Sequence, residues 1–342
     1  MRNFTHHNVK DIVVCTALPN QKLESNNSQS IAVAEQTTSD LGFMAAEKII
    51  KARNIEPDEI GALVFLSKTP DYRGPATAMV LQNRLDIPVD CIVYDSPMGS
   101  GGFENAVNLG LSLLSSISKK YVLVVFGDTV SKQLTEEDMQ ELNFQDGATA
   151  MILERGAHSF PISMATMTLS DYWRSFMVPS GGFRNNESFY QSLSSKRPGQ
   201  LSKHIHINEA DVFKAVAPEM DGIKEKVMAL ISDKYQSNFA IAINLLEPRL
   251  EQELAGLFPS EIRANHVFLS SNLLPQTMAS TIPLMLSDII RDDRDLPFQI
   301  ISVSLGEGLS VNVLSMEVKE STVLEPIYSD AYYSNGFVTH EM

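Results

Sequence analysis

The sequence predicts a layered α/β fold made of two similar halves. Short apolar runs that are typical of buried strands alternate with segments in which apolar residues recur at helical spacing. This alternation continues to about residue 157 and begins again after residue 210, which indicates an internal duplication. The 342 residues, 44% of them hydrophobic, are enough to bury a large core in one large domain or two closely packed domains.

The first half alternates strands and helices in regular order. The run that ends at Pro19 is typical of a first strand, and the segment Thr37 to Asp40 supplies capping residues for the first helix. The continuous apolar run at residues 121–126 is typical of a strand buried on both faces of a parallel sheet. The expected strands cover residues 13–19, 62–67, 91–94, 121–126 and 148–153, and the expected helices cover residues 41–50, 76–85 and 103–117.

The second half repeats this order after an excursion that contains the sole tryptophan, Trp173. A hairpin with a glycine-containing turn at residues 305–308 closes it, and the tail after Val318 is polar and has no pattern. We therefore divide the chain into an N-terminal half (1–157), an excursion (158–210), a C-terminal half (211–318) and a tail (319–342). The expected helices of this half cover residues 211–235, 247–257 and 276–290, and the expected strands cover residues 239–243, 266–270, 298–304 and 309–318.

The stretch at residues 89–117 is typical of a buried strand, a glycine-rich elbow and a helix. Ser100 stands at the start of that helix. The first amides of a helix have no internal partner and carry the positive end of its dipole, so this position favours negative charge. Ser100 is therefore a candidate nucleophile for acyl transfer, or else a simple helix cap.

Composition narrows the classes of partner. The net charge of −15 argues against nucleic acid or an anionic membrane as the main partner and leaves small molecules and proteins. The two cysteines cannot form a disulfide framework, and both lie in apolar runs. There is no apolar run of about 18 residues and no secretion signal at the N-terminus, so we expect no membrane span and a cytoplasmic location.

Other polar clusters predict no metal or phosphate site. His204 and His206 alternate as on one face of a strand, but no third ligand accompanies them. The acidic run at residues 292–295 is typical of a solvated loop. The glycines around Ser100 have neither the spacing nor the lysine of a common phosphate-binding loop.

Several motifs occur together in the order of one family. TTSDLGFMAAEKII, FLSKTPDY, GATAMILE, VPSGG, DVFK, STIP and LGEGLS follow one another between residues 37 and 318. In these motifs the chain resembles the thiolase superfamily, and specifically β-ketoacyl-acyl-carrier-protein synthase III. The resemblance implies a five-layered α-β-α-β-α fold with two duplicated halves, usually a homodimer, and a role in fatty-acid or polyketide-type acyl metabolism.

The catalytic positions depart from the family pattern. The family's cysteine nucleophile lies in an elbow that matches residues 95–103, where this chain has Ser100. The positions of the family's histidine and asparagine match Asn244 and Gln276. Gly306, in the hairpin turn that helps to form the family's oxyanion hole, is retained.

These replacements affect proton transfer first. A serine hydroxyl needs an adjacent general base, and neither Asn244 nor Gln276 accepts a proton at neutral pH. Their amides can still donate hydrogen bonds to a carbonyl oxygen, so an acyl-CoA or acyl-carrier thioester is a possible ligand, and we expect no other cofactor. The family's T-G-I-x-x-R motif, which helps to form the coenzyme A entrance, is missing from residues 23–36.

Three hypotheses follow, and whether the chain is an enzyme stays open. The first is a catalytically degenerate subunit, a pseudoenzyme that forms a heterodimer with an active synthase III paralogue; a homodimer and an acyl-carrier-protein partner are also considered. The second is an acyltransferase that uses Ser100 as the acyl acceptor. The third is a ligand-binding protein unrelated to condensation.

Overall fold

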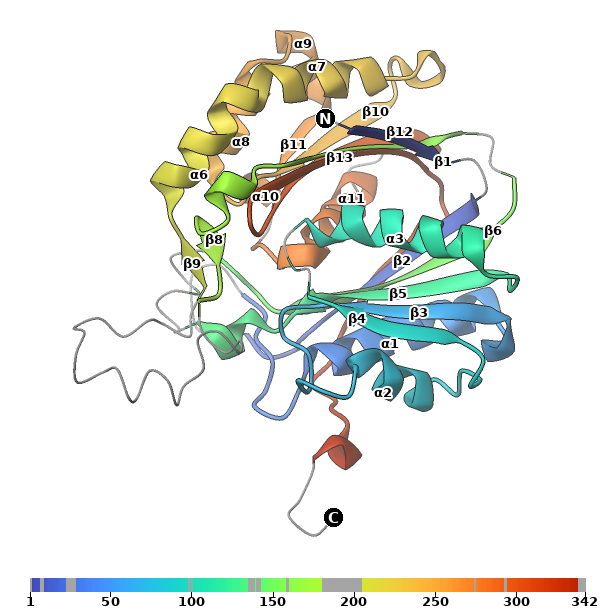
Figure 1. Ribbon diagram of the computed structural model, residues 1–342. Helices are drawn as coiled ribbons and strands as arrows, with labels where there is room; N and C mark the ends of the chain where they lie inside the picture. The colour runs from blue at the N-terminus through green and yellow to red at the C-terminus, as the bar shows by residue number, and fades with distance from the viewer. Residues whose placement is uncertain are drawn as a thin grey trace, which may run out of the picture.

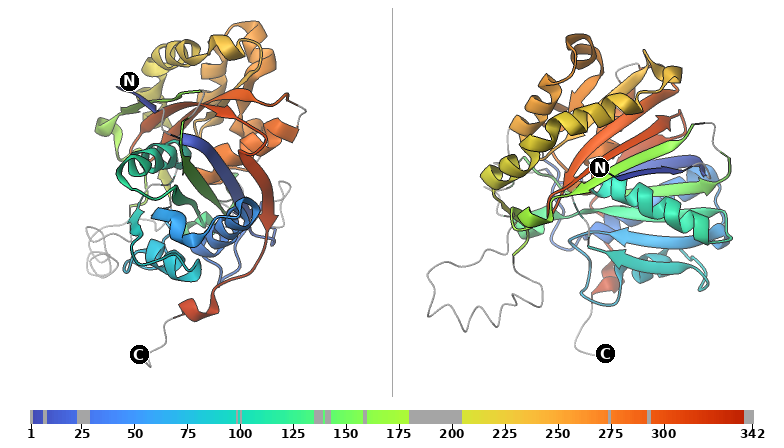
Figure 2. Two further views of the ribbon diagram at one scale, coloured as in Figure 1. Left: turned by 90° about the vertical axis from the view of Figure 1, so that its right-hand side faces the viewer. Right: turned by 45° about the horizontal axis from the view of Figure 1, so that its top comes forward.

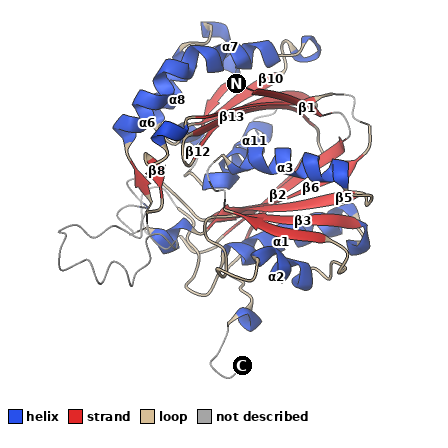
Figure 3. Cartoon of the chain, in the orientation of Figure 1, coloured by secondary structure: helices blue, strands red, loops and turns tan. Residues whose placement is uncertain are grey.

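The computed structural model shows two stacked β-sheets with helices outside and between them (Figure 1). It describes residues 2–6, 9–22, 29–97, 99, 101–134, 139, 143–157, 160–179, 205–273, 275–291 and 294–337. Two helix layers cover the outer faces of the sheets and a third layer fills the space between them, as Figure 3 shows by secondary structure. The five layers expected from the resemblance are present.

The first sheet holds the elbow strand at one edge. Its six strands are ordered β14-β2-β6-β5-β3-β4, with β4 and β5 parallel to β3. Helices α1 and α2 cover the outer face and α3 lies on the inner face (Figure 1). The bounds are β2 Val9–Leu18, β3 Ile60–Leu66, β4 Ile92–Ser96, β5 Tyr121–Asp128, β6 Gly147–Arg155, β14 Val323–Tyr328, α1 Thr38–Arg53, α2 Thr77–Arg84 and α3 Gly102–Ser116.

The second sheet has the order β1-β7-β13-β12-β10-β11. Helices α6 to α8 cover its outer face, and α11 lies beside α3 between the sheets (Figure 1). The bounds are β1 Arg2–His6, β7 Ile162–Thr168, β10 Phe239–Asn244, β11 Val267–Leu269, β12 Phe298–Gly306, β13 Ser310–Val318, α6 Glu209–Val216, α7 Met220–Leu230, α8 Pro248–Gly256, α9 Ser260–His266, α10 Ser270–Leu273 and α11 Thr281–Arg291. A separate pair, β8 Phe176–Met177 and β9 His206–Ile207, joins the two ends of the excursion.

The apolar runs of the sequence become the buried strands. Every residue of β3, β5 and β12 is buried, because helices or the other sheet cover both faces of these strands. None of the helices in the described part of the chain has the length and apolar character needed to span a bilayer.

Two predicted helices are wrong in their extent. The helix expected over residues 211–235 is two helices, α6 and α7, separated by a 3-10 turn at Ala217–Glu219, because Pro218 lacks the amide that would continue the first helix. The helix expected from residue 276 begins at Thr281. Gln276 instead forms an isolated parallel bridge with Phe144.

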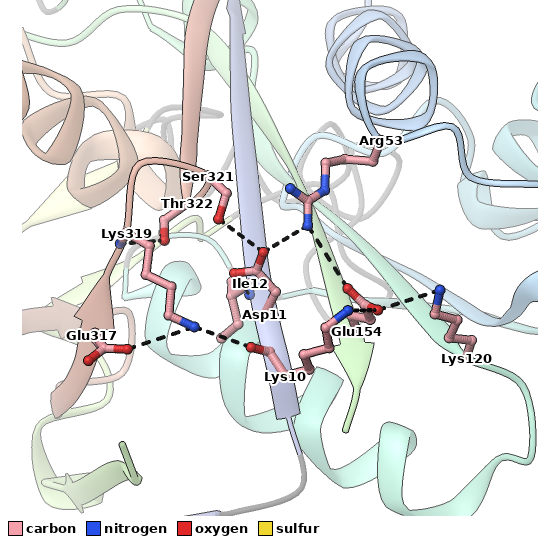
Figure 4. A network of polar contacts seen from close by, with 10 residues as sticks. All are labelled: Lys10, Asp11, Ile12, Arg53, Lys120, Glu154, Glu317, Lys319, Ser321 and Thr322. Atoms are coloured by element: carbon pink, nitrogen blue, oxygen red, sulfur yellow. Dashed lines mark hydrogen bonds and ion pairs between the residues drawn. The ribbon is translucent and has the colours of Figure 1, made fainter. Parts of the chain in front are cut away.

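The excursion and the tail each supply a strand that the sequence pattern missed. Strand β7 pairs with β13 and β1 in the second sheet, and β14 adds to the edge of the first sheet beside β2. The segment before β14 is tied to β2 by Asp11, whose carboxylate accepts hydrogen bonds from Ser321 and Arg53 at 3.0 and 2.8 Å (Figure 4). The sheets therefore do not follow the four segments defined from the sequence.

The end of the tail packs against the N-terminal half. The guanidinium of Arg84 lies 4.3 Å from the ring centroid of Phe43 and 4.6 Å from that of Tyr333, and it also pairs with Asp40 at 2.8 Å. Beyond this, the hydroxyl of Tyr72 donates to the carbonyl of Gly336. Figure 2 shows the tail leaving the first sheet on the side away from the second sheet.

Candidate active site

The elbow lies where the end of β4 meets the start of α3. Ser100 itself is outside the described residues, but its neighbours are placed. Gly101 has φ +70°, and a Cβ at this position would come within 3.3 Å of the backbone of Gly306. A Cβ at Gly102 would lie 2.5 Å from the Cβ of Ala279. The elbow is therefore held closely against the β12–β13 turn, and the structure brings Gly306 to it.

Asn244 ends β10 and is buried. Its Oδ1 atom lies 3.2 Å from the hydroxyl of Ser270, which also lies 2.6 Å from the carboxyl of Glu251. Glu251 further accepts hydrogen bonds from Leu245 N and from Ser271, and burial raises its pKa. This network could not be predicted from the sequence, because Glu251 lies within the polar pattern of α8.

Gln276 faces a small cavity. Its Nε2 atom donates to the carbonyl of Leu246 at 3.4 Å, and its Oε1 atom is buried without a hydrogen-bond partner among the described residues. The cavity beside it has a volume of about 160 Å³ and is also lined by Phe176, Glu247 and Leu305. Asn244 is not among the described residues that line this cavity.

A second, larger cavity of about 1040 Å³ is also lined by Phe176. The loop after β3, from Ser67 to Arg73, forms one wall, and Trp173 and β8 form another. Pro97 of the elbow, Glu307 and Gly308 also line it. Phe176 therefore borders both cavities, and the elbow borders the larger one.

Two charged side chains that the sequence analysis missed contact the elbow. Lys68, after β3, forms an ion pair with Glu307 in the β12–β13 turn, and both side chains are largely buried. An oxygen of Glu307 accepts a hydrogen bond from Gly99 N at 3.3 Å. A Cβ at Gly99 would lie 2.3 Å from Cε of Lys68, so the pair packs directly on the elbow backbone. The available signals were the lysine after a buried strand and a glutamate inside a glycine turn.

Asp128 lies beneath this pair at the end of β5 and is fully buried. Its Oδ1 atom accepts hydrogen bonds from Lys68 N at 2.7 Å and from the hydroxyl of Ser67 at 3.1 Å, whereas Oδ2 has no hydrogen-bond partner among the described residues. Burial raises the pKa of Asp128 to about 7, although the nearby Lys68 cation acts in the opposite direction.

Glu104 connects the elbow helix to the second sheet. Its two carboxyl oxygens accept hydrogen bonds from Ser302 and Ser304 on β12, each at 2.6 Å. The side chain is completely buried, and this burial raises its pKa despite the two serine hydroxyls. Glu104 therefore fixes the first turn of α3 to the second sheet.

The described histidines lie elsewhere. The ring of His266 stacks on Phe239 at a centroid distance of 4.1 Å and contacts its carbonyl, and His206 belongs to β9. His204 is outside the described residues. In the parts of the chain that the structure describes, no three His, Cys, Asp or Glu side chains gather as a possible metal site.

Comparisons with known proteins agree with this geometry. The family model described as 3-oxoacyl-[acyl-carrier-protein (ACP)] synthase III matches residues 94–169, which include the elbow. The β-ketoacyl-[acyl-carrier-protein] synthase III of Shigella flexneri serotype 5b is 25% identical over 275 residues, which are 79% of this chain and 81% of the relative. The chain is thus synthase III-like: it is similar in sequence to these proteins of the thiolase superfamily over about four fifths of its length.

Further relatives extend the likeness of this synthase III-like protein. The enzyme of the same name from Rhizorhabdus wittichii is 26% identical over 82% of this chain and 84% of its own length. The crystal structure of a 3-oxoacyl-(acyl-carrier protein) synthase from Burkholderia xenovorans aligns with a TM-score of 0.80 and 23% identity over 96% of this chain and 99% of its own. A tetronic acid condensing enzyme aligns with a TM-score of 0.67 and 17% identity over 90% of this chain and all of its own.

The thiolase fold predicted from the sequence is thereby confirmed. The relatives are named as β-ketoacyl-[acyl-carrier-protein] synthase III, and one of the solved structures is named as a condensing enzyme. The roles assigned to Ser100, Asn244, Gln276 and Gly306 stay predictions.

Proposed function

We propose that this synthase III-like protein is a catalytically degenerate subunit of acyl metabolism that pairs with an active synthase. The observation that carries the proposal is the surroundings of Asn244 and Gln276, the two polar side chains at the matched catalytic positions. The Oδ1 atom of Asn244 accepts a hydrogen bond from the buried hydroxyl of Ser270, and Gln276 lines a cavity of about 160 Å³. Neither amide can take a proton from a nucleophile at neutral pH.

The size of that cavity also supports loss of thioester turnover. Pockets that hold small molecules usually have volumes of roughly 300–1,000 Å³. Here Phe176, Leu246 and Glu247 narrow the space beside Gln276.

Co-expression of the tagged chain with the intact synthase III of the same cell is expected to give a stable heterodimer. An inactive subunit that keeps the fold can still present the surface through which it associates with a partner. Size-exclusion chromatography with light scattering measures the assembly, and the tagged chain expressed alone serves as the control. An isolated homodimer that condenses acyl thioesters by itself would contradict the proposal.

A second function, acyl transfer to Ser100, is favoured by one observation. The carboxylate of Glu307 accepts a hydrogen bond from Gly99 N, one residue from Ser100, and Glu307 is paired with Lys68. Charged groups beside a nucleophile position are the usual means of activating it.

If this second function holds, incubation with an acyl-CoA is expected to increase the intact mass of the protein by one acyl group. The bond formed joins the serine oxygen to the acyl carbon, the thioester C–S bond breaks, and the released thiol carries the proton. Mass spectrometry of the whole chain measures the adduct, and Ser100→Ala is the matched control. The same gain in that variant, or no gain in the unaltered chain, excludes a serine acyl-enzyme.

We also propose the cytoplasm as the compartment and an acyl carrier protein as a possible further partner. The two cysteines, Cys15 and Cys91, are both buried and free, which suits a reducing compartment. A homodimer is the alternative assembly.

A further inference from the structure

We infer that the cavity beside Gln276 binds a small aliphatic amine in its protonated form. The site then takes a hydrogen-bond donor, whereas a thioester carbonyl is an acceptor. The proposed function assigns no ligand to the degenerate subunit, so this assignment goes beyond it. The cavity has a volume of about 160 Å³. A protein cavity of roughly 150 Å³ holds a molecule of the size of benzene, so a ligand of about six non-hydrogen atoms fits.

The side-chain oxygen of Gln276 is the group that requires a donor. Oε1 is buried without a hydrogen-bond partner among the described residues, and the whole residue is only 4% exposed. Rotation of the amide by 180° would not satisfy this oxygen, because Oε1 would then face the carbonyl of Leu246, to which Nε2 now donates. A buried acceptor without a donor is unfavourable, so a ligand that supplies one gains affinity here.

The backbone holds Gln276 firmly beside the cavity. Its N–H donates to the carbonyl of Asn143 at 2.8 Å, and its carbonyl accepts from Gln145 N at 2.8 Å. Two apolar residues of the adjoining segments, Leu246 and Met278, have left-handed backbone conformations with φ of +65° and +52°. Such conformations are uncommon for apolar residues and cluster at functional sites, where surrounding contacts impose them. The unpartnered oxygen therefore belongs to a fixed segment.

The charges that line the cavity favour a cation. Glu209 and Glu247 line it, and the described lining residues include no lysine, arginine or histidine. Glu247 accepts hydrogen bonds from two of the first amides of α8, and Glu209 begins α6, so the positive ends of two helix dipoles offset part of this charge. Arg249 pairs with Glu253 at 3.2 Å and does not line the cavity. An ammonium group is therefore attracted and a carboxylate is repelled.

The remaining wall suits an aliphatic chain. Phe144, Phe176 and Leu305 line the cavity and are buried. Glu209 and Pro248 also line it and are exposed, which indicates that the cavity opens to solvent on their side. An alkylammonium ion of about five carbons matches both parts, because its chain contacts the apolar wall while its N–H groups supply the donor that Gln276 lacks.

Isothermal titration of the full-length chain, as it purifies, with n-pentylamine hydrochloride at pH 7 tests the inference. Alkylamines are protonated at that pH. 1-Pentanol is a donor of the same size without charge, and pentanoate has the same size and the opposite charge. We expect pentylammonium to bind, pentanol to bind about tenfold more weakly, and pentanoate not to bind at the same concentrations. Absence of pentylammonium binding overturns the inference, and so does equal binding of pentanoate.

Gln276→Leu removes the acceptor and nearly keeps the volume of the side chain. Pentylammonium should bind this variant at least about tenfold more weakly than the unaltered chain. Benzene should bind it equally well or better, because the wall becomes more apolar. Unchanged pentylammonium affinity overturns the inference, since the amine would then not depend on Gln276. A loss of benzene binding would mean that the variant has lost the cavity, and Glu247→Gln then decides.

Glu247→Gln removes one negative charge and keeps an acceptor for the first amides of α8. Pentylammonium should bind this variant about threefold more weakly, whereas the affinity for pentanol should not change. Equal changes for the two ligands, or no change for either, contradict the inference. A merely structural role of Glu247 would not separate a charged ligand from a neutral one of the same size.

Gln133→Leu is the matched control. Gln133 also has a buried Oε1 atom without a partner among the described residues, but it lines the larger cavity. Pentylammonium affinity should not change in this variant, and a loss as large as that in Gln276→Leu would show that the amine binds elsewhere. Heterodimer formation is measured separately, so the proposed function and the amine site can fail independently.

Discussion

Asp128→Asn is expected to make the protein more stable than the unaltered chain at pH 8 and to leave its stability nearly unchanged at pH 4. Asp128 is fully buried at the end of β5, and burial raises its pKa from 3.8 to about 7. A carboxyl whose pKa is higher in the folded state binds its proton more tightly there than in the unfolded chain. Its contribution to stability is therefore complete below pH 4 and is lost as the pH rises through 7.

The size of this effect follows from the shift. About three pKa units correspond to at most about 4 kcal/mol of difference between the protonation states. The asparagine side chain can keep the acceptor that receives hydrogen bonds from Lys68 N and Ser67, and its amide group replaces the oxygen that has no partner among the described residues. The variant should thus resemble the protonated native form at every pH.

Urea unfolding at pH 4, 6 and 8 measures the difference in free energy of unfolding between the variant and the unaltered chain. Asp58→Asn, at an exposed position in a short 3-10 turn, is the matched control and should show no such trend. A difference that stays constant with pH would show that Asp128 is ionised at the same pH in the folded and unfolded chains.

Glu104→Ala is expected to lower the free energy of unfolding by about 3 kcal/mol. The substitution leaves a cavity between the sheets and removes the acceptor of two buried serine hydroxyls, those of Ser302 and Ser304. Glu104→Gln keeps the volume and part of the hydrogen bonding, so its loss should be less than half as large. Urea unfolding at a single pH measures both.

A double-mutant cycle isolates the contribution of the hydrogen bonds that Ser302 and Ser304 donate to Glu104. With Ser302→Ala and Ser304→Ala already present, Glu104→Ala should cost at least 1 kcal/mol less than it does alone, because the partners of the carboxyl are gone. Ser112→Ala is a control on the same helix, since its exposed hydroxyl bonds only within α3. Additive losses would mean that Glu104 contributes by filling space and not through the serines.

Several parts of the fold could be predicted because local patterns decide them. The buried runs that became β3, β5, β10 and β12 are continuous and apolar, and the capping residues before Leu41 mark the start of α1. The strands β7 and β14 were missed because local patterns do not decide them. β14 is only partly buried and mixes polar and apolar residues, so its pairing with β2 and not its own pattern makes it a strand.

In the candidate site, too, local patterns predicted some features, and others depend on contacts between distant elements. The elbow was predictable from its glycines and the following helix, and Gly306 from its turn, and the structure brings Gly306 against Gly101. No pattern in the sequence indicates that Oδ1 of Asn244 contacts Ser270, which in turn contacts Glu251. Side-chain direction at the end of a strand depends on neighbours from other elements, which a linear pattern does not contain.

By itself the sequence determined the duplicated α/β layers and the position of the elbow, because hydrophobic periodicity and glycine conformation act over a few neighbouring residues. Only the tertiary structure decided which charges reach that elbow. Lys68 and Asp128 meet at the ends of the neighbouring strands β3 and β5, whereas stacking of the two sheets brings Glu307 to Lys68 and brings Ser302 and Ser304 to Glu104, at buried positions. Burial there raises the pKa of both Asp128 and Glu104, an effect that depends on enclosure and not on the order of residues along the chain.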